Sequence, residues 1–315
     1  MSDGVFTHIA LLGTFLFLPV IEYILKTDSS NLDKETEEEF LESGYFDFLV
    51  YSMVPIQFFL VILFCYKITV NDYNVLELTG LISALGVSCG VIGINVAHEL
   101  GHRTKKSEQI MAKLLLSTSL YSHFFVEHNK GHHRHVSTPL DPASADIGEN
   151  LYLFWIKSVW GSFISALKFE RKKKWYLNEV IIWKIIEISF ILLISLVFSS
   201  TAAICFVASA TFGFLLLETI NYIEHYGLRR KKLENGRYER VTPVHSWNSD
   251  HIVSRYVLFD LSRHSDHHAN PSRKYQVLRS FEESPQLPSG YPSMVLLALI
   301  PPLWFSIMDK NIIKN

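Results

Sequence analysis

The chain has 315 residues, of which 49% are hydrophobic and only 19% are charged, and its mean hydropathy is +0.18. This composition is outside the range of an ordinary soluble domain, and a formal net charge of −2 excludes a nucleic-acid-binding protein that relies on bulk positive charge. The three cysteines lie singly in apolar runs, which excludes a disulfide framework and a CxxC metal site.

Five apolar runs are long enough to cross a bilayer as helices, which takes about 20 residues. These runs are residues 5–25, 48–70, 75–97, 180–198 and 201–223. Three shorter or more polar stretches are expected to be re-entrant, interfacial or protein-buried helices: 110–126, 151–167 and 292–308. We therefore predict an all-α, multi-pass integral membrane helical bundle that forms a single domain over residues 1–315.

Lysine and arginine indicate the orientation of this bundle. If the N-terminus lies outside, the outer connections contain no lysine or arginine: 1–4, 71–74 and 199–200. Every basic cluster then lies inside, as the positive-inside rule requires. We expect a protein of the inner (cytoplasmic) membrane, and the histidine clusters described below then form a metal site that faces the cytoplasm.

The first histidine cluster follows the third apolar run as HELGH, residues 98–102. On a continuing helix His98 and His102 stand on one face, so both imidazoles can reach one metal ion. The same letters match the HExxH signature of zinc proteases, in which Glu99 would be the general base. At this point a protease, another metal site and a chance match all remain open.

Two further clusters repeat this spacing. EHNKGHH, residues 127–133, contains His128, His132 and His133, and HSDHH, residues 264–268, contains three more histidines: His264, His267 and His268. Together the three clusters supply eight histidines, which exceeds the four ligands of a tetrahedral zinc and suits two metal ions with open positions.

His225 follows the fifth apolar run at a place that mirrors His98. We consider it as a ninth ligand, with an interfacial histidine as the alternative. Ligating imidazoles usually donate their second N–H to a carboxylate or carbonyl. The candidates for this orienting role, for which surface ion pairs are the alternative, are Glu99, Glu127, Glu224, His245, Asp250 and Asp266.

Four motifs in this order resemble those of the integral-membrane alkane 1-monooxygenases, which are non-haem di-iron hydroxylases. The motifs are HELGHR (98–103), EHNKGHH (127–133), NYIEHYGL (221–228) and LSRHSDHH (261–268). The sequence around these motifs is also similar, as in TPLDPASADIGE (138–149), and the resemblance extends from about residue 45 to about residue 310. Arg103, Ser262 and His135 depart from the family pattern, and the family usually has one further span at the front.

The resemblance implies O2-dependent hydroxylation of an alkane to a 1-alkanol, with electrons supplied by rubredoxin and rubredoxin reductase. It implies that two irons are bound by His98, His102, His128, His132, His133, His225, His264, His267 and His268. The chain has no four-cysteine iron site, flavin motif or GxGxxG, so a separate electron donor is required. The basic residues of 168–174 or 229–232 could bind an acidic carrier, and the alternative is positive-inside topology alone.

Three rival functions follow from the same residues. One is a membrane di-iron desaturase or hydroxylase that acts on fatty acyl chains or alkylaromatics. Another is an intramembrane zinc protease, which would leave the second and third histidine clusters without a role. The last is a metal transporter, although transport sites usually lie near the bilayer midplane and these histidines follow the inner ends of the runs.

Overall fold

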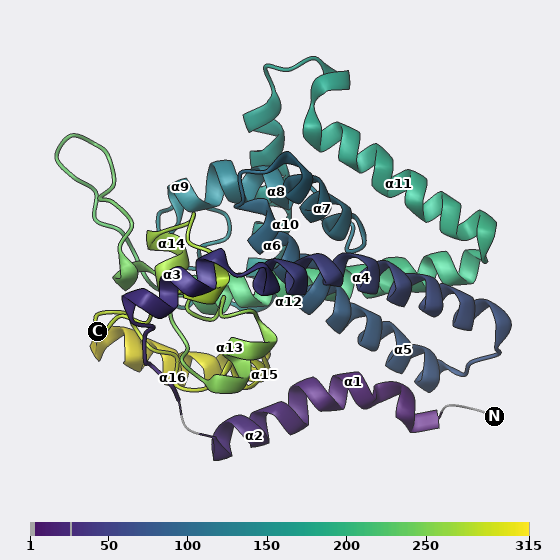
Figure 1. The fold of residues 1–315 in the computed structure, drawn as a ribbon, viewed down its shortest axis with the longest axis horizontal. Coiled ribbons are helices and arrows are strands. Elements are labelled where there is room, and N and C mark those ends of the chain that lie inside the picture. Colours follow the sequence, from purple (N-terminus) through teal and green to yellow (C-terminus); the bar gives the residue numbers. More distant parts are fainter. Residues whose placement is uncertain (1–3, 26, 315) are drawn as a thin grey trace. The chain divides into compact units, whose positions relative to one another are not determined.

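The structure is a computed structural model that describes residues 4–25 and 27–314. The described residues form helices and connecting segments, with isolated β-bridges and no strand among them (Figure 1). The predicted all-α class is confirmed. The chain divides into two compact units: unit 1 contains 1–17, 44–126 and 166–217, and unit 2 contains 18–43, 127–165 and 218–315.

Five helices among the described residues are long and apolar enough to cross a membrane, as predicted. They are Gly4–Ile24, Gly44–Val70, Val75–Gly101, Glu179–Val197 and Ser200–His225. The first long helix comprises η1 (Gly4–His8), α1 (Ile9–Leu12), η2 (Gly13–Phe17) and α2 (Leu18–Ile24), and the second is α4. The third comprises α5 (Val75–Ser88), η3 (Cys89–Ile94) and α6 (Asn95–Gly101). The fourth is α11 and the fifth is α12. Their ends differ from the predicted ones by a few residues.

The three shorter predicted stretches also form helices. They are α7 (Lys106–Ser117) with α8 (Phe124–Glu127), α10 (Leu151–Glu170), and α15 (Tyr291–Ala298) with α16 (Pro301–Lys314). On α10, Leu153, Ile156, Trp160 and Ile164 are exposed, and their spacing of three and four residues places them on one face of the helix. Of the three predicted alternatives for this stretch, re-entrant, interfacial or protein-buried, the exposed apolar stripe favours an interfacial helix.

The core of unit 1 joins α4, α5, α11 and the first part of α12. Phe64, Leu85, Ile194 and Phe206 are buried in this core. Small residues allow α5 and α12 to approach closely, because a Cβ on Gly86 would lie 2.5 Å from the Phe212 ring. Such close approach is how membrane helices pack without a hydrophobic driving force between them.

In unit 2, residues 18–43 are fastened to the C-terminal part of the chain by polar contacts. Glu22 on α2 accepts hydrogen bonds from the backbone N–H and the hydroxyl of Ser254, at 2.9 and 2.5 Å. Asp28 pairs with Arg255 at 2.8 Å. The acidic stretch then continues into α3 (Lys34–Glu42), which begins where the Asp33 carboxylate accepts from the N–H of Thr36.

Candidate metal centre

The first histidine pair lies at the end of the third long helix, in unit 1. His98 is on α6 and His102 is the residue at its C-terminus, so the helical spacing predicted from sequence is present. Their ring centroids are 5.0 Å apart, and one nitrogen of each ring lies within 4.8 Å of the other. The two imidazoles can therefore contribute to one metal site.

Arg103 fixes the end of α6 that carries this pair. Its guanidinium is buried and donates to Glu99 at 2.9 and 3.1 Å. It also pairs with Asp47 at 2.5 Å and with Glu108 at 3.0 Å, and these three carboxylates raise its pKa against the effect of burial. One buried cation thus ties α6 to the starts of α4 and α7, which holds the histidine pair in place.

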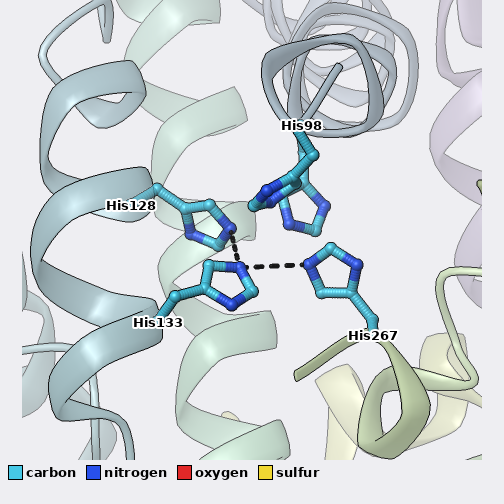
Figure 2. A group of neighbouring side chains, drawn as sticks. His98, His128, His133 and His267 are labelled. Atoms are coloured by element: carbon cyan, nitrogen blue, oxygen red, sulfur yellow. Dashed lines mark hydrogen bonds between the residues drawn. The ribbon is translucent and has the colours of Figure 1, made fainter. Parts of the chain in front are cut away.

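Three imidazoles in unit 2 form a second group, and Figure 2 shows two hydrogen bonds among them. His128 and His133 come from η4 (His128–His132) and the start of α9 (His133–His135), while His267 comes from α14 (His264–Ala269). The Nε2 atom of His133 lies 2.9 Å from His128 Nε2 and 3.2 Å from His267 Nε2. Three Nε2 atoms therefore converge on one point.

A third group, also in unit 2, contains four buried histidines. They are His132, His225, His264 and His268, and one nitrogen of each lies within 4.8 Å of those of the others. The Nε2 atoms of His225 and His264 are 3.3 Å apart. His225 is the last residue of α12, so the structure brings it beside three residues of the predicted clusters.

The sequence clusters are thus divided between groups. His132 lies with His264 and His268, whereas His128 and His133 lie with His267. The cause is a π-helical turn at His128–His132, in which the wider turn places residues five apart above each other. Such single turns are rare and often occur at functional sites.

The chemistry of these groups fits a metal ion. The Nε2 atom of His132 and both ring nitrogens of His268 are buried and have no hydrogen-bond partner among the described residues. Buried polar atoms without partners are costly, and a cation would satisfy them. Burial, and then the charge of nearby His264, hold the pKa of His268 well below its usual value, so this imidazole is neutral and its lone pair can ligate.

His132 has a carboxylate partner on its other ring nitrogen. Its Nδ1 lies 2.9 Å from Oδ2 of Asp141, and both side chains are buried. Burial alone would lower the pKa of His132, but the Asp141 carboxylate raises it above the usual value. Burial raises the pKa of Asp141, but the charge of His132 and the hydrogen bonds from His132 and Ser144 lower it by more. The pKa of Asp141 is therefore below its usual value, and the carboxylate is ionised. This is the carboxylate–histidine arrangement that orients metal ligands.

Glu224, a predicted orienting residue, lies beside His264. Its Oε2 lies 3.1 Å from Nε2 of His264, the same nitrogen that faces His225. Its Oε1 accepts a hydrogen bond of 2.7 Å from the hydroxyl of Tyr291. The carboxylate therefore lies beside the nitrogen atoms that converge, rather than behind an imidazole.

The other orienting candidates contact several kinds of partner. Glu99 pairs with Arg103, Asp250 accepts from Ser280 at 2.6 Å, and Asp266 accepts from Asn270, Arg273 and the backbone of Arg279. His245 lies 3.2 Å from Glu239. Glu127 is buried, and burial followed by the nearby Asp141 charge raises its pKa to about 8.

Asp141 and Tyr291 were not identified from the sequence. A signal for Asp141 exists, because it lies in the TPLDPASADIGE stretch nine residues after His132 and is the one acid in its first half. No such signal marks Tyr291, which is 67 residues from Glu224 in the chain.

The comparisons with known proteins agree with this picture. The fatty acid desaturase family model matches residues 75–298. Alkane 1-monooxygenase from Acinetobacter baylyi is 40% identical over 311 residues, which cover 95% of this chain and 75% of the relative.

Two further relatives extend the comparison. Alkane 1-monooxygenase 2 from Pseudomonas aeruginosa is 41% identical over 308 residues, covering 95% of this chain and 82% of the relative. The xylene/toluene monooxygenase hydroxylase component from Pseudomonas putida is 30% identical over 248 residues, covering 76% and 66%. The chain therefore belongs to the fatty acid desaturase family and, within it, to the alkane 1-monooxygenases, which are oxidoreductases.

Proposed function

We propose that this chain hydroxylates the terminal carbon of an alkane to give a 1-alkanol. O2 supplies the inserted oxygen atom, and two electrons and two protons convert the other oxygen atom to water. The observation that carries this proposal is the convergence of buried imidazoles in a chain about 40% identical to alkane 1-monooxygenases. We further propose that both units act as one catalytic domain.

The proposed cofactor is a pair of irons held by the nine histidines named from the sequence. His132, His225, His264 and His268 would hold one iron, and His128, His133 and His267 would contribute ligands to the other. Imidazole suits several transition metals, and open coordination positions are typical of iron oxygenases. When bound, ferrous iron would supply the redox chemistry that activates O2.

The protein's own part is to position ligands and to exclude water. Asp141 accepts a hydrogen bond from the Nδ1–H of His132, which directs the Nε2 atom of His132 toward the other three histidines of its group. Arg103 holds the end of α6 through three carboxylates. An alkane offers no polar atom, so its binding depends on burial of methylene groups, each worth about 0.8 kcal/mol, among the apolar helices.

Metal analysis tests the foundation of the proposal. Protein purified anaerobically in mild detergent is expected to contain two irons per chain and little zinc. The expected result supports assays with alkanes and labelled oxygen, in which the label should appear in the alcohol. One zinc per chain after growth with ample iron would overturn the di-iron proposal and favour the protease or transporter reading.

A second candidate reaction is favoured by one relative. The Pseudomonas putida protein is named as a xylene/toluene monooxygenase component, so the methyl group of an alkylaromatic, or an acyl chain, is the alternative substrate. Product analysis with an n-alkane and an alkylbenzene in parallel separates these reactions. Desaturation would give an alkene, whereas hydroxylation gives an alcohol.

We propose rubredoxin, reduced by rubredoxin reductase, as the electron donor, and a cytoplasmic position for the metal site in the inner membrane with the N-terminus outside. The positive-inside rule supports this orientation. Residues 229–240 form an extended loop between α12 and α13 (Ile252–Val257), drawn in green in Figure 1. Lys231 and Lys232 are exposed on it and could attract an acidic carrier.

Reversing these two charges tests the proposed docking. The double variant Lys231→Glu, Lys232→Glu is expected to lower rubredoxin-dependent turnover about tenfold at low salt, because complementary charge accelerates association. Turnover with a small artificial reductant should not change. An equal loss with both reductants would contradict docking at this loop.

A further inference from the structure

The connection from α10 to α11 combines exposed positive charge with exposed aromatic side chains. Residues 171–177, called here the anchor segment, contain Arg171 and three lysines followed by Trp175, Tyr176 and Leu177. The last three side chains are 68%, 50% and 56% exposed. Large apolar side chains that remain this exposed indicate a surface that another phase or molecule covers.

The anchor segment ends where a membrane helix begins. Asn178 is buried and caps the start of α11 (Glu179–Val197), because its side chain accepts a hydrogen bond from the N–H of Ile181 in the first turn. That helix is the most apolar of the five long helices, and little of it is buried inside the protein. Residues just before such a helix lie at the level of the lipid headgroups, where tryptophan, tyrosine and lysine are favoured.

The charges of the anchor segment are mostly uncompensated. Lys173 pairs with Glu170 at 2.5 Å. In the described part of the chain, the side chains of Arg171, Lys172 and Lys174 form no ion pair with a carboxylate. Three cations beside exposed aromatic rings are therefore available to an anionic partner.

The loop 229–240 presents its charge in a different way. Arg229 pairs with Asp146, and Arg230 donates to the backbone oxygen of Glu239. Its one aromatic residue, Tyr238, is only partly exposed. This loop therefore has positive charge without the exposed tryptophan and tyrosine that favour the membrane interface.

We propose that the anchor segment binds the phosphate groups of anionic phospholipids. Arg171, Lys172 and Lys174 contact the headgroups, and Trp175 and Tyr176 insert their rings at the boundary with the acyl chains. Each basic residue near an anionic membrane surface adds to this attraction. The inference goes beyond the proposed function, because it depends on neither the metal nor the reaction.

Fluorescence quenching in lipid nanodiscs tests this proposal. The full-length protein is placed in discs that contain either brominated phosphatidylglycerol or brominated phosphatidylcholine at the same mole fraction, and Trp175 quenching is obtained as the difference between wild type and Trp175→Phe. We expect the brominated anionic lipid to quench Trp175 more strongly. In the triple variant Arg171→Gln, Lys172→Gln, Lys174→Gln, which retains the Lys173 pair, this preference should fall about tenfold or more.

A matched variant in the loop 229–240 controls for net charge. Lys231→Gln, Lys232→Gln, Arg237→Gln also removes three exposed cations and should retain the lipid preference. Equal quenching by both lipids in wild type, or an equal loss in the loop variant, would overturn the proposal. If the anchor variant kept its lipid preference but lost turnover with an acidic electron carrier, the segment would be a protein docking site instead. Iron content in both variants reports separately on the di-iron proposal.

Discussion

The His268→Gln variant is expected to lose one metal ion and at least 100-fold of the activity. His268 is buried in the group with His132, His225 and His264, and both its ring nitrogens lack hydrogen-bond partners among the described residues. Glutamine is a weak metal ligand, so three imidazoles would remain where four converge. The measurement is iron per chain together with alkanol formation.

His135→Gln is the matched control, because His135 lies in the same stretch of chain as His132 and His133 but belongs to neither group of converging nitrogens. It should retain its full metal content. If His268→Gln also retained two metal ions and wild-type turnover, the group of four would not be a metal site.

The five membrane helices could be predicted from sequence because a bilayer sets a minimum length for an apolar helix. The details inside those helices could not. The third long helix changes to a π-helix at Cys89–Ile94, where each turn contains about one residue more than in an α-helix. The composition of the apolar run does not change there, so the sequence does not indicate the π-helix. Hydrogen bonds between distant segments of unit 2, such as that from Ser254 to Glu22, also could not be predicted, because they depend on tertiary packing rather than on a local sequence pattern.

The candidate ligands were identifiable because each cluster contains histidines three or four residues apart, which stand on one side of a helix. Their division into groups was not, because the π-helical turn at His128–His132 brings the Nε2 atom of His133 within 2.9 Å of that of His128, whereas His132 belongs to the other group. The partner of His132 was missed for a related reason. Asp141 reaches it through the irregular loop after α9, whose path is not encoded in a periodic pattern.

Replacing Asp141 by asparagine is expected to reduce iron affinity, or turnover at limiting iron, by about 10- to 100-fold, the range found when an orienting partner of a metal ligand is lost. Asparagine keeps the size of the side chain and can still accept from the Nδ1–H of His132. It removes the negative charge that holds His132 in this orientation, and it weakens the acceptor of the Ser144 hydroxyl. The measurement is the rate at which a chelator removes iron, with alkanol formation measured in parallel.

Asp146→Asn provides the comparison, since Asp146 lies in the same loop but is exposed and pairs with Arg229. Its iron loss should match wild type. Asp141→Glu should restore part of the iron retention, because it returns the charge to the buried site. A general folding defect would instead lower the melting temperature of the metal-free protein without changing iron loss from the folded fraction. Wild-type iron loss in Asp141→Asn would show that His132 does not depend on this carboxylate, and the role assigned to Asp141 would be wrong.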